Sequence, residues 1–168
     1  MKKIIIVLFL FTVIFFINQG EEEYIIPNSA IRLRVIANGN TFEDQAKKME
    51  IKNNIENILK NDLISVSSKT EADQIINKKI PEIKTMINNY NIPYNLNYGQ
   101  NYFPEKSYKG IKYESGNYES LVVTLGSGQG ENWWCVLFPP LCLMEAEEEN
   151  TENVDYAWFV KDVFKKYM

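Results

Sequence analysis

Histidine is absent from this chain of 168 residues, and cysteine occurs only at Cys135 and Cys142. The absence of histidine excludes the Ser-His and Cys-His pairs of nucleophilic catalysis, and it excludes metal triads that contain histidine. Two cysteines fall short of the four ligands of a usual structural zinc site. We therefore expect no catalytic residue, no metal site and no cofactor.

Positive charge is also scarce. Lysine and arginine together number 18 against 22 aspartates and glutamates, which gives a formal net charge of -4. Because nucleic-acid-binding domains usually carry a basic surface, we expect no nucleic-acid partner. Hydrophobic residues make up 45% of the chain, which is ample for one core in a domain of this length.

The N-terminus has the order of charges and apolar residues that is typical of a secretory signal. Lys2 and Lys3 precede an apolar run over residues 4–17, and three glutamates follow at 21–23. Fourteen helical residues span roughly 21 Å, which is short for a hydrocarbon core of about 30 Å. We predict that residues 1–20 are a signal peptide for export or, if they are not cleaved, a membrane anchor through residues 4–17.

Export would place Cys135 and Cys142 in an oxidising compartment. An even pair separated by six residues is then a candidate disulfide that closes a small loop. Two free buried thiols are the alternative.

Hydrophobic periodicity predicts helices and strands along most of the chain. A strand is expected near residues 31–36, and a helix over about 42–62 is expected to begin with a capping box of Thr41 and Asp44. A second helix follows Ser67 and Ser68, and Pro81 is expected to kink or split it. Alternating patterns over 94–98, 111–113 and 118–125 predict an antiparallel meander or a set of hairpins.

The order of these elements predicts an α+β fold in which helices pack on a small antiparallel sheet after the N-terminal signal or anchor segment. We expect a single domain over residues 21–144. Residues 145–168 are expected to form an acidic, loop-like spacer and a C-terminal amphipathic helix, which has lysines on one side and aromatic and aliphatic residues on the other.

The segment GENWWCVLFPPLCLM, residues 130–144, concentrates aromatic residues, prolines and both cysteines. If Trp133 and Trp134 lie on a regular strand, they cannot both point into one core. We expect Pro139 and Pro140 to form a stiff, exposed turn. Tryptophan is often a partner anchor, so partner binding competes here with simple core packing. The preceding GSGQGEN segment, 126–132, lacks the spacing of a phosphate-binding loop, so we interpret it as a connection.

Two segments resemble the stage II sporulation protein R family of endospore-forming bacteria. They are IRLRVIANGNTFEDQAKK, residues 31–48, and FPEKSYKGIKYESGNYESLVVTLGSGQGENWWCVLFPPLC, residues 103–142. The family pattern is closer to Leu-His-Val-Ile-Ala-Asn-Ser-Asp where this chain has Arg34 and Gly39-Asn40. The Asn-Trp-Trp-Cys and Phe-Pro-Pro-Leu-Cys strings carry most of the resemblance.

The resemblance implies an exported, non-enzymatic signalling protein that acts between the forespore and the mother cell. Its partner would be the extracytoplasmic face of a membrane-embedded aspartic protease, which removes the pro-sequence of a sigma factor. Our candidate partner-binding residues are Trp133, Trp134, Phe138, Pro139 and Pro140, with Asn132 as a turn or capping residue and Asn38, Asp44 and Gln45 as secondary candidates. The alternatives are an extracytoplasmic cell-wall hydrolase that uses acids such as Glu119 and Asp44, and a tethered structural envelope protein.

Overall fold

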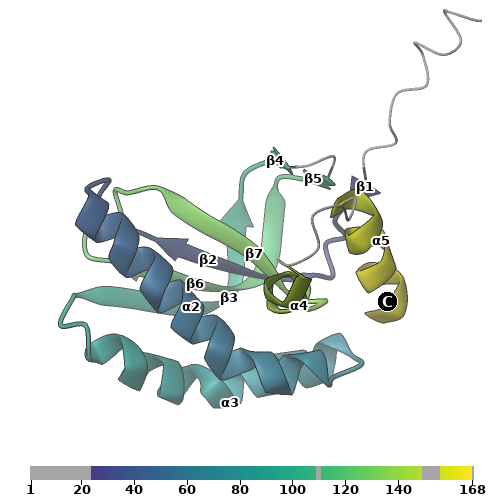
Figure 1. The fold of residues 1–168 in the computed structure, drawn as a ribbon, viewed down its shortest axis with the longest axis horizontal. Coiled ribbons are helices and arrows are strands. Elements are labelled where there is room, and N and C mark those ends of the chain that lie inside the picture. The colour runs from purple at the N-terminus through teal and green to yellow at the C-terminus, as the bar shows by residue number, and fades with distance from the viewer. Residues whose placement is uncertain (1–23, 109–110, 149–155, 168) are drawn as a thin grey trace, which may run out of the picture.

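The structure, a computed structural model, describes residues 24–108, 111–148 and 156–167 (Figure 1). The strands are β1 (Tyr24–Ile25), β2 (Ile31–Ile36), β3 (Tyr94–Phe103), β4 (Lys106–Tyr108), β5 (Ile111–Tyr113), β6 (Gly116–Leu125) and β7 (Asn132–Phe138). The helices are α2 (Phe42–Ile64), α3 (Lys69–Asn88), α4 (Leu141–Glu148) and α5 (Tyr156–Tyr167). The predicted signal or anchor, residues 1–20, lies outside the described residues. Within those residues, no helix is both long and apolar enough to span a bilayer.

The larger sheet has the strand order β3-β6-β2-β7. The predicted α+β fold is confirmed, but the sheet is mixed because β2 runs parallel to β6. The direction of the chain explains this arrangement. Two successive helices separate β2 from β3, so β3 runs opposite to β2, and the antiparallel return into β6 restores the direction of β2. Strand β7 then pairs antiparallel with β2.

Helices α2 and α3 cover one face of this sheet. The buried residues of α2 and α3, among them Ile51, Ile55 and Ile83, share one core with Leu33 and Val35 of β2. The predicted start of α2 is confirmed, because the Thr41 side chain caps the helix by accepting a hydrogen bond from the Asp44 N–H. The burial of alternate β2 residues under two helices is what positions the strand.

Pro81 does not split α3, which is continuous from Lys69 to Asn88. Proline removes one backbone donor and disfavours a helix interior. Here Pro81 is exposed, while Ile76, Ile83 and Ile87 on the buried face continue to pack into the core. Tertiary packing therefore outweighs the local cost of the proline.

The chain between β3 and β6 departs from a simple meander. Strands β4 and β5 leave the large sheet and form a separate sheet of order β1-β5-β4, in which β1 pairs parallel with β5 (Figure 1). Helix α5 lies beside this small sheet and buries Phe159, Val160 and Val163 in a second core with Ile111 and Val136.

The predicted acidic spacer is described only up to Glu148, and its remaining residues, 149–155, lie outside the described residues. Residues up to Glu148 form α4, so the expected loop-like segment is helical at its start. The predicted amphipathic helix is confirmed as α5, since Phe164 is buried whereas Lys165 and Lys166 are exposed. The Tyr167 hydroxyl donates to the Ile64 carbonyl over 3.0 Å, which ties the end of α5 to the end of α2.

Candidate partner-binding site

The two adjacent tryptophans of β7 lie on opposite faces of the sheet, as the alternation of a strand predicts. Trp133 pairs in register with Val35 and packs against the core under the helices. The Lys52 ammonium of α2 lies 4.3 Å from the centre of its ring. Trp134 pairs with Arg34 and belongs to the face that α2 and α3 leave uncovered. Trp133 is thus a packing residue, and Trp134 is the candidate anchor.

Trp134 is half-buried in a group of aromatic and basic side chains. Its ring meets Phe103 edge-on at 5.1 Å between centroids. The Arg34 guanidinium lies 4.6 Å from the ring centroid and the Lys106 ammonium lies 5.4 Å from it. Cations over an indole face are attracted by its quadrupole, so this tryptophan is held in place rather than free to rotate.

Arg32 lies at the centre of the same face and is 2% exposed. Its guanidinium is 4.2 Å from the ring centre of Phe103, 4.6 Å from that of Tyr118 and 5.2 Å from that of Tyr113. Burial lowers the pKa of Arg32 to about 10, while Tyr118 and Tyr113 act in the opposite direction. The side chain is therefore still charged at neutral pH. Within the described residues, its Nε and Nη1 atoms have no hydrogen-bond partner.

A pocket with a volume of about 420 Å³ opens beside Arg32 and Trp134. Its walls come from β2, β4, β5, β7 and the first residues of α4 and α5. The lining includes Arg32, Lys106, Tyr108, Tyr113, Asn132, Trp134, Val136, Leu141 and Tyr156. Asn132 is the first residue of β7 and pairs with Ile36, so it extends the strand instead of forming the expected turn.

Pro139 and Pro140 are buried, which contradicts the exposed turn predicted for them, and the candidate Phe138 is buried beside them. The chain passes from β7 almost directly into α4, with a cis peptide bond between Phe138 and Pro139. Phe138 packs edge-on against Tyr167 of α5 at 6.1 Å between centroids. Because α4 and α5 fold back over this end of β7, the prolines form an internal corner. Direct contact of these three residues with a partner would require the corner to open.

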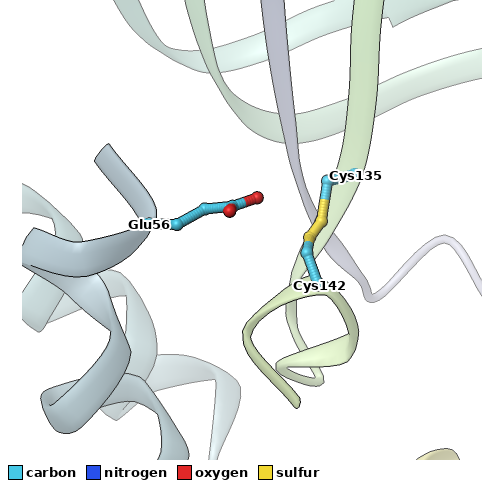
Figure 2. A group of neighbouring side chains, drawn as sticks. All are labelled: Glu56, Cys135 and Cys142. Carbon is cyan, nitrogen blue, oxygen red and sulfur yellow. A yellow bond between two sulfur atoms is a disulfide. The ribbon is translucent and has the colours of Figure 1, made fainter. Parts of the chain in front are cut away.

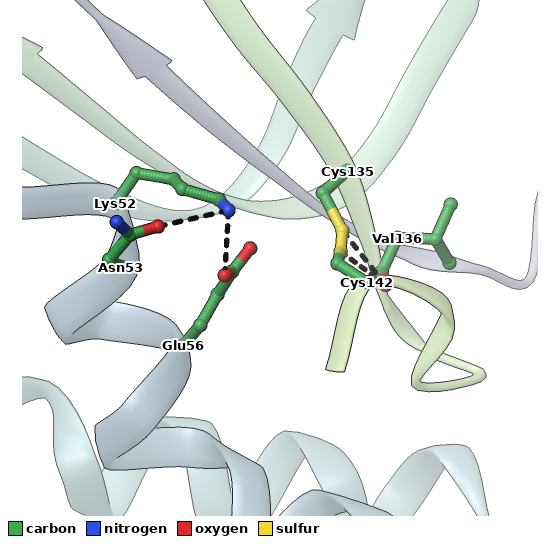
Figure 3. Close-up of a disulfide and its surroundings, with 6 residues drawn as sticks. All are labelled: Lys52, Asn53, Glu56, Cys135, Val136 and Cys142. Atoms are coloured by element: carbon green, nitrogen blue, oxygen red, sulfur yellow. Dashed lines mark hydrogen bonds and ion pairs between the residues drawn. A yellow bond between two sulfur atoms is a disulfide. The ribbon is translucent and has the colours of Figure 1, made fainter. Parts of the chain in front are cut away.

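A disulfide joins Cys135 to Cys142, with 6.1 Å between their Cα atoms. It links the middle of β7 to the first turn of α4 across the proline corner. Glu56 of α2 is 7% exposed and extends toward the disulfide, as Figure 2 shows. Its carboxylate pairs with Lys52 at 2.8 Å, which is drawn in Figure 3. A buried carboxylate beside an apolar bridge is thus neutralised by a lysine one helical turn away.

Glu56, Cys135 and Cys142 are also the group of described side chains that comes nearest to a metal site. Their ligand atoms lie within 4.8 Å of one another. Thiolates, not disulfide sulfurs, bind zinc. Since the two sulfurs are joined, the group offers a single carboxylate ligand, and the residues present do not fit a metal ion.

The secondary candidates Asn38, Asp44 and Gln45 hold two loops together. Asn38 donates to Asp44 Oδ1 over 3.1 Å, and its own Oδ1 accepts the Ser127 N–H over 2.9 Å. Gln45 Nε2 donates to the Gly39 carbonyl over 2.9 Å. The hydrogen bonds from Asn38, and then those from Thr41, lower the pKa of Asp44. The hydrogen bonds of these three residues stabilise the two loops, and this structural role accounts for the residues without a contact to a partner protein.

The GSGQGEN loop is confirmed as a tight connection into β7. Gly126 has φ +54°, and a Cβ atom there would collide with the Asn38 side chain. A Cβ at Gly130 would lie 2.2 Å from the Gly39 carbonyl oxygen. The glycines therefore allow close packing against residues 37–40 and are not arranged around an anion.

The two acids of the hydrolase hypothesis do not come together. Glu119, near the start of β6, pairs with Lys69 of α3 at 2.9 Å. Asp44 is bonded through Asn38 to Ser127, just beyond the other end of β6. The strand residues between these ends span roughly 20 Å at about 3.3 Å each. A glycosidase needs its two carboxylates about 5 to 10 Å apart.

No pattern in the sequence marks Arg32 or Lys106 as site residues. Alternation with Leu33 places Arg32 on the polar side of β2, where exposure is expected. The alternation does not reveal that Phe103, Tyr113 and Tyr118 from three other strands surround it. An arginine on a central strand, combined with many aromatic residues elsewhere, is the signal that the sequence offers.

Residues 27–148 match the family model described as stage II sporulation protein R. The stage II sporulation protein R of Bacillus subtilis (strain 168) is 35% identical over 134 residues, which are 76% of this chain. The chain spans about 60% of the length of that relative. No solved structure matches. The matched region includes β2, both covering helices and the whole of β7, and the chain belongs to the stage II sporulation protein R family.

Proposed function

We propose that this protein is an exported, non-enzymatic signalling protein of endospore formation. It activates a membrane-embedded aspartic protease that removes the pro-sequence of a sigma factor. The observation that carries this proposal is the family match over residues 27–148, which includes the Trp133 to Cys142 segment. The protein acts in the space between the forespore and the mother cell, and contacts the extracytoplasmic face of the protease.

A non-enzymatic role is supported by the chemistry of the chain. The sequence has no histidine, and Asp44 and Glu119 are each engaged in local contacts at opposite ends of β6. The Cys135–Cys142 disulfide is compatible with an oxidising compartment. These observations favour a protein that acts by binding.

Activation by binding requires a difference in affinity. A ligand shifts the balance between two receptor states only if it binds one state more tightly than the other. The uncovered face of the sheet around Trp134 offers a preorganised surface for such binding, because aromatic contacts already hold its side chains. We place the protease contact on this face.

The test is to replace Trp134 by alanine and to follow processing of the pro-sigma factor in cells that produce the protease. Trp158→Ala is the matched control, since Trp158 is 63% exposed on α5 and does not line the pocket. We expect Trp134→Ala to reduce processing at least roughly tenfold, as loss of a central aromatic anchor does. Trp158→Ala should leave it unchanged. The amount of folded protein is measured in parallel.

Normal processing by a folded Trp134→Ala protein would remove Trp134 from the contact. Absence of any processing with the unchanged chain, in cells that contain the protease and its substrate, would contradict the function itself. An intact-mass measurement of the mature protein separates export with cleavage from a tethered protein, because a tether retains residues 1–20.

A further inference from the structure

The pocket beside Arg32 carries positive charge that its walls do not neutralise. Arg32 and Lys106 both line it, and no aspartate or glutamate is among the described lining residues. Arg32 is 2% exposed and its guanidinium contacts the rings of Phe103 and Tyr118, yet its Nε and Nη1 have no hydrogen-bond partner among the residues that the structure describes. Ring contacts offset only part of the cost of burying a cation, and an anion bound in the pocket would offset more of it.

We propose that this pocket binds the carboxylate of an aspartate or glutamate side chain in an extended peptide segment of a partner protein. The carboxylate accepts hydrogen bonds from Arg32 and pairs with Lys106. The inference rests on the proposed function for the identity of the partner, and it adds the chemistry of the segment that is recognised.

The rest of the lining favours an anion on a carbon framework over a free inorganic anion. Trp134, Tyr113 and Tyr156 contribute rings, and Val136 and Leu141 contribute aliphatic surface. A peptide side chain with apolar neighbours covers these walls while its carboxylate reaches the guanidinium. A small inorganic anion would leave them exposed to water.

The strand edges around the pocket favour a peptide. Residues Asn132 to Val136 of β7 line it consecutively, as do Lys106 to Tyr108 of β4. Each of these strands is at the edge of its sheet. Edge strands present backbone N–H and C=O groups that an extended peptide can pair with, while alternate side chains enter pockets.

The experiment uses the purified full chain and three probes. They are the blocked tetrapeptide acetyl-Val-Tyr-Asp-Val-amide, its counterpart with asparagine in place of aspartate, and sodium acetate. NMR follows the indole N–H of Trp134 and the Nε–H of Arg32. We expect the aspartate peptide to shift both signals, and the asparagine peptide and acetate to bind at least roughly tenfold more weakly, because each lacks part of the recognised group.

Two substitutions test the residues. Arg32→Gln is expected to lower the affinity for the aspartate peptide at least roughly tenfold. Lys112→Gln is the control, because Lys112 is a cation of the same small sheet that pairs with Glu105 and does not line the pocket. It should change binding less than about threefold. If Arg32→Gln does not fold, Lys106→Gln replaces an exposed lining residue and is expected to weaken the peptide about threefold or more.

Equal binding of the aspartate and asparagine peptides would overturn the proposal, as would unchanged affinity in Arg32→Gln or, if that variant does not fold, in Lys106→Gln. If acetate bound as tightly as the peptide, the pocket would be a site for a small carboxylate and the peptide proposal would be wrong. These titrations contain no protease, so their failure is separate from a failure of protease activation. If the protein activates the protease but does not bind the peptide, only the proposal of a carboxylate pocket is contradicted.

Discussion

The two faces of the central strand β2 are built from opposite kinds of residue. On the face under α2 and α3, Leu33 and Val35 are fully buried in a continuous apolar core. On the other face, Arg32 is almost as deeply buried, but among aromatic rings and beside a pocket. The helix-covered face is explained by folding, because burial of apolar surface stabilises the domain. A buried guanidinium with two unpaired nitrogens costs free energy on folding, which its ring contacts offset in part, and the proposed carboxylate pocket gives this charge a use in binding.

The largest expected effect comes from truncating the helix-covered face. Leu33→Ala should lower the free energy of unfolding by about 3 kcal/mol, because it removes buried methyl groups and leaves a cavity. The measurement is urea denaturation followed by circular dichroism. Val122→Ala is the control on the opposite face, since Val122 pairs with Arg34 and is only half-buried. We expect a loss of about 1 kcal/mol there, and equal losses at the two positions would abolish the contrast.

Loss of the disulfide should lower the stability slightly less than Leu33→Ala. The bridge joins the middle of β7 to α4, and β7 contributes side chains to both faces of the sheet. Replacing Cys135 and Cys142 together by alanine should lower the free energy of unfolding by about 2.5 kcal/mol, the chain-entropy value for a loop of this length. Reduction of the unchanged protein with dithiothreitol should give a similar loss, and the alanine pair should not respond to the reductant. If neither treatment changed the free energy of unfolding, the packing of α4 and α5 would be sufficient to hold the proline corner.

Much of the helix-covered face could be predicted from the sequence. The alternation of Leu33 and Val35, the capping of α2 by Thr41 and the apolar stripes of both helices are local patterns, and the structure confirms them. The opposite orientations of Trp133 and Trp134 also follow from alternation within one strand. Local periodicity is sufficient where one face of an element is buried against a single core.

The features that sequence interpretation missed depend on contacts between distant segments. The small sheet arises because Tyr24 pairs with Ile111, far along the chain, and no local pattern encodes that pairing. Pro139 and Pro140 are buried at the end of β7, where Leu141 of α4 and Phe159 of α5 share a core with Val136 and Tyr167 packs against Phe138. The cage around Arg32 likewise joins side chains from four other strands. Charge and proline content predict exposure on average, and tertiary packing reverses both expectations at this end of the molecule.

The smallest expected change in stability tests the comparison most directly. Arg32→Met keeps an unbranched side chain against the rings of Phe103 and Tyr118, and it removes the buried charge with its unpaired nitrogens. Replacing a buried charge by an apolar side chain of similar size is often neutral or stabilising, so we expect a free energy of unfolding within about 1 kcal/mol of the parent, or above it. Urea denaturation measures this, and the same protein should fail to shift the Trp134 signal with the aspartate peptide. A loss of about 3 kcal/mol or more, as at Leu33, would instead make Arg32 a structural residue, because its ring contacts would then contribute more than its desolvation costs. If Arg32→Met keeps its stability but does not bind the peptide, the charge of Arg32 is not needed for folding. Binding would then be the reason that a cation is buried on this face of β2.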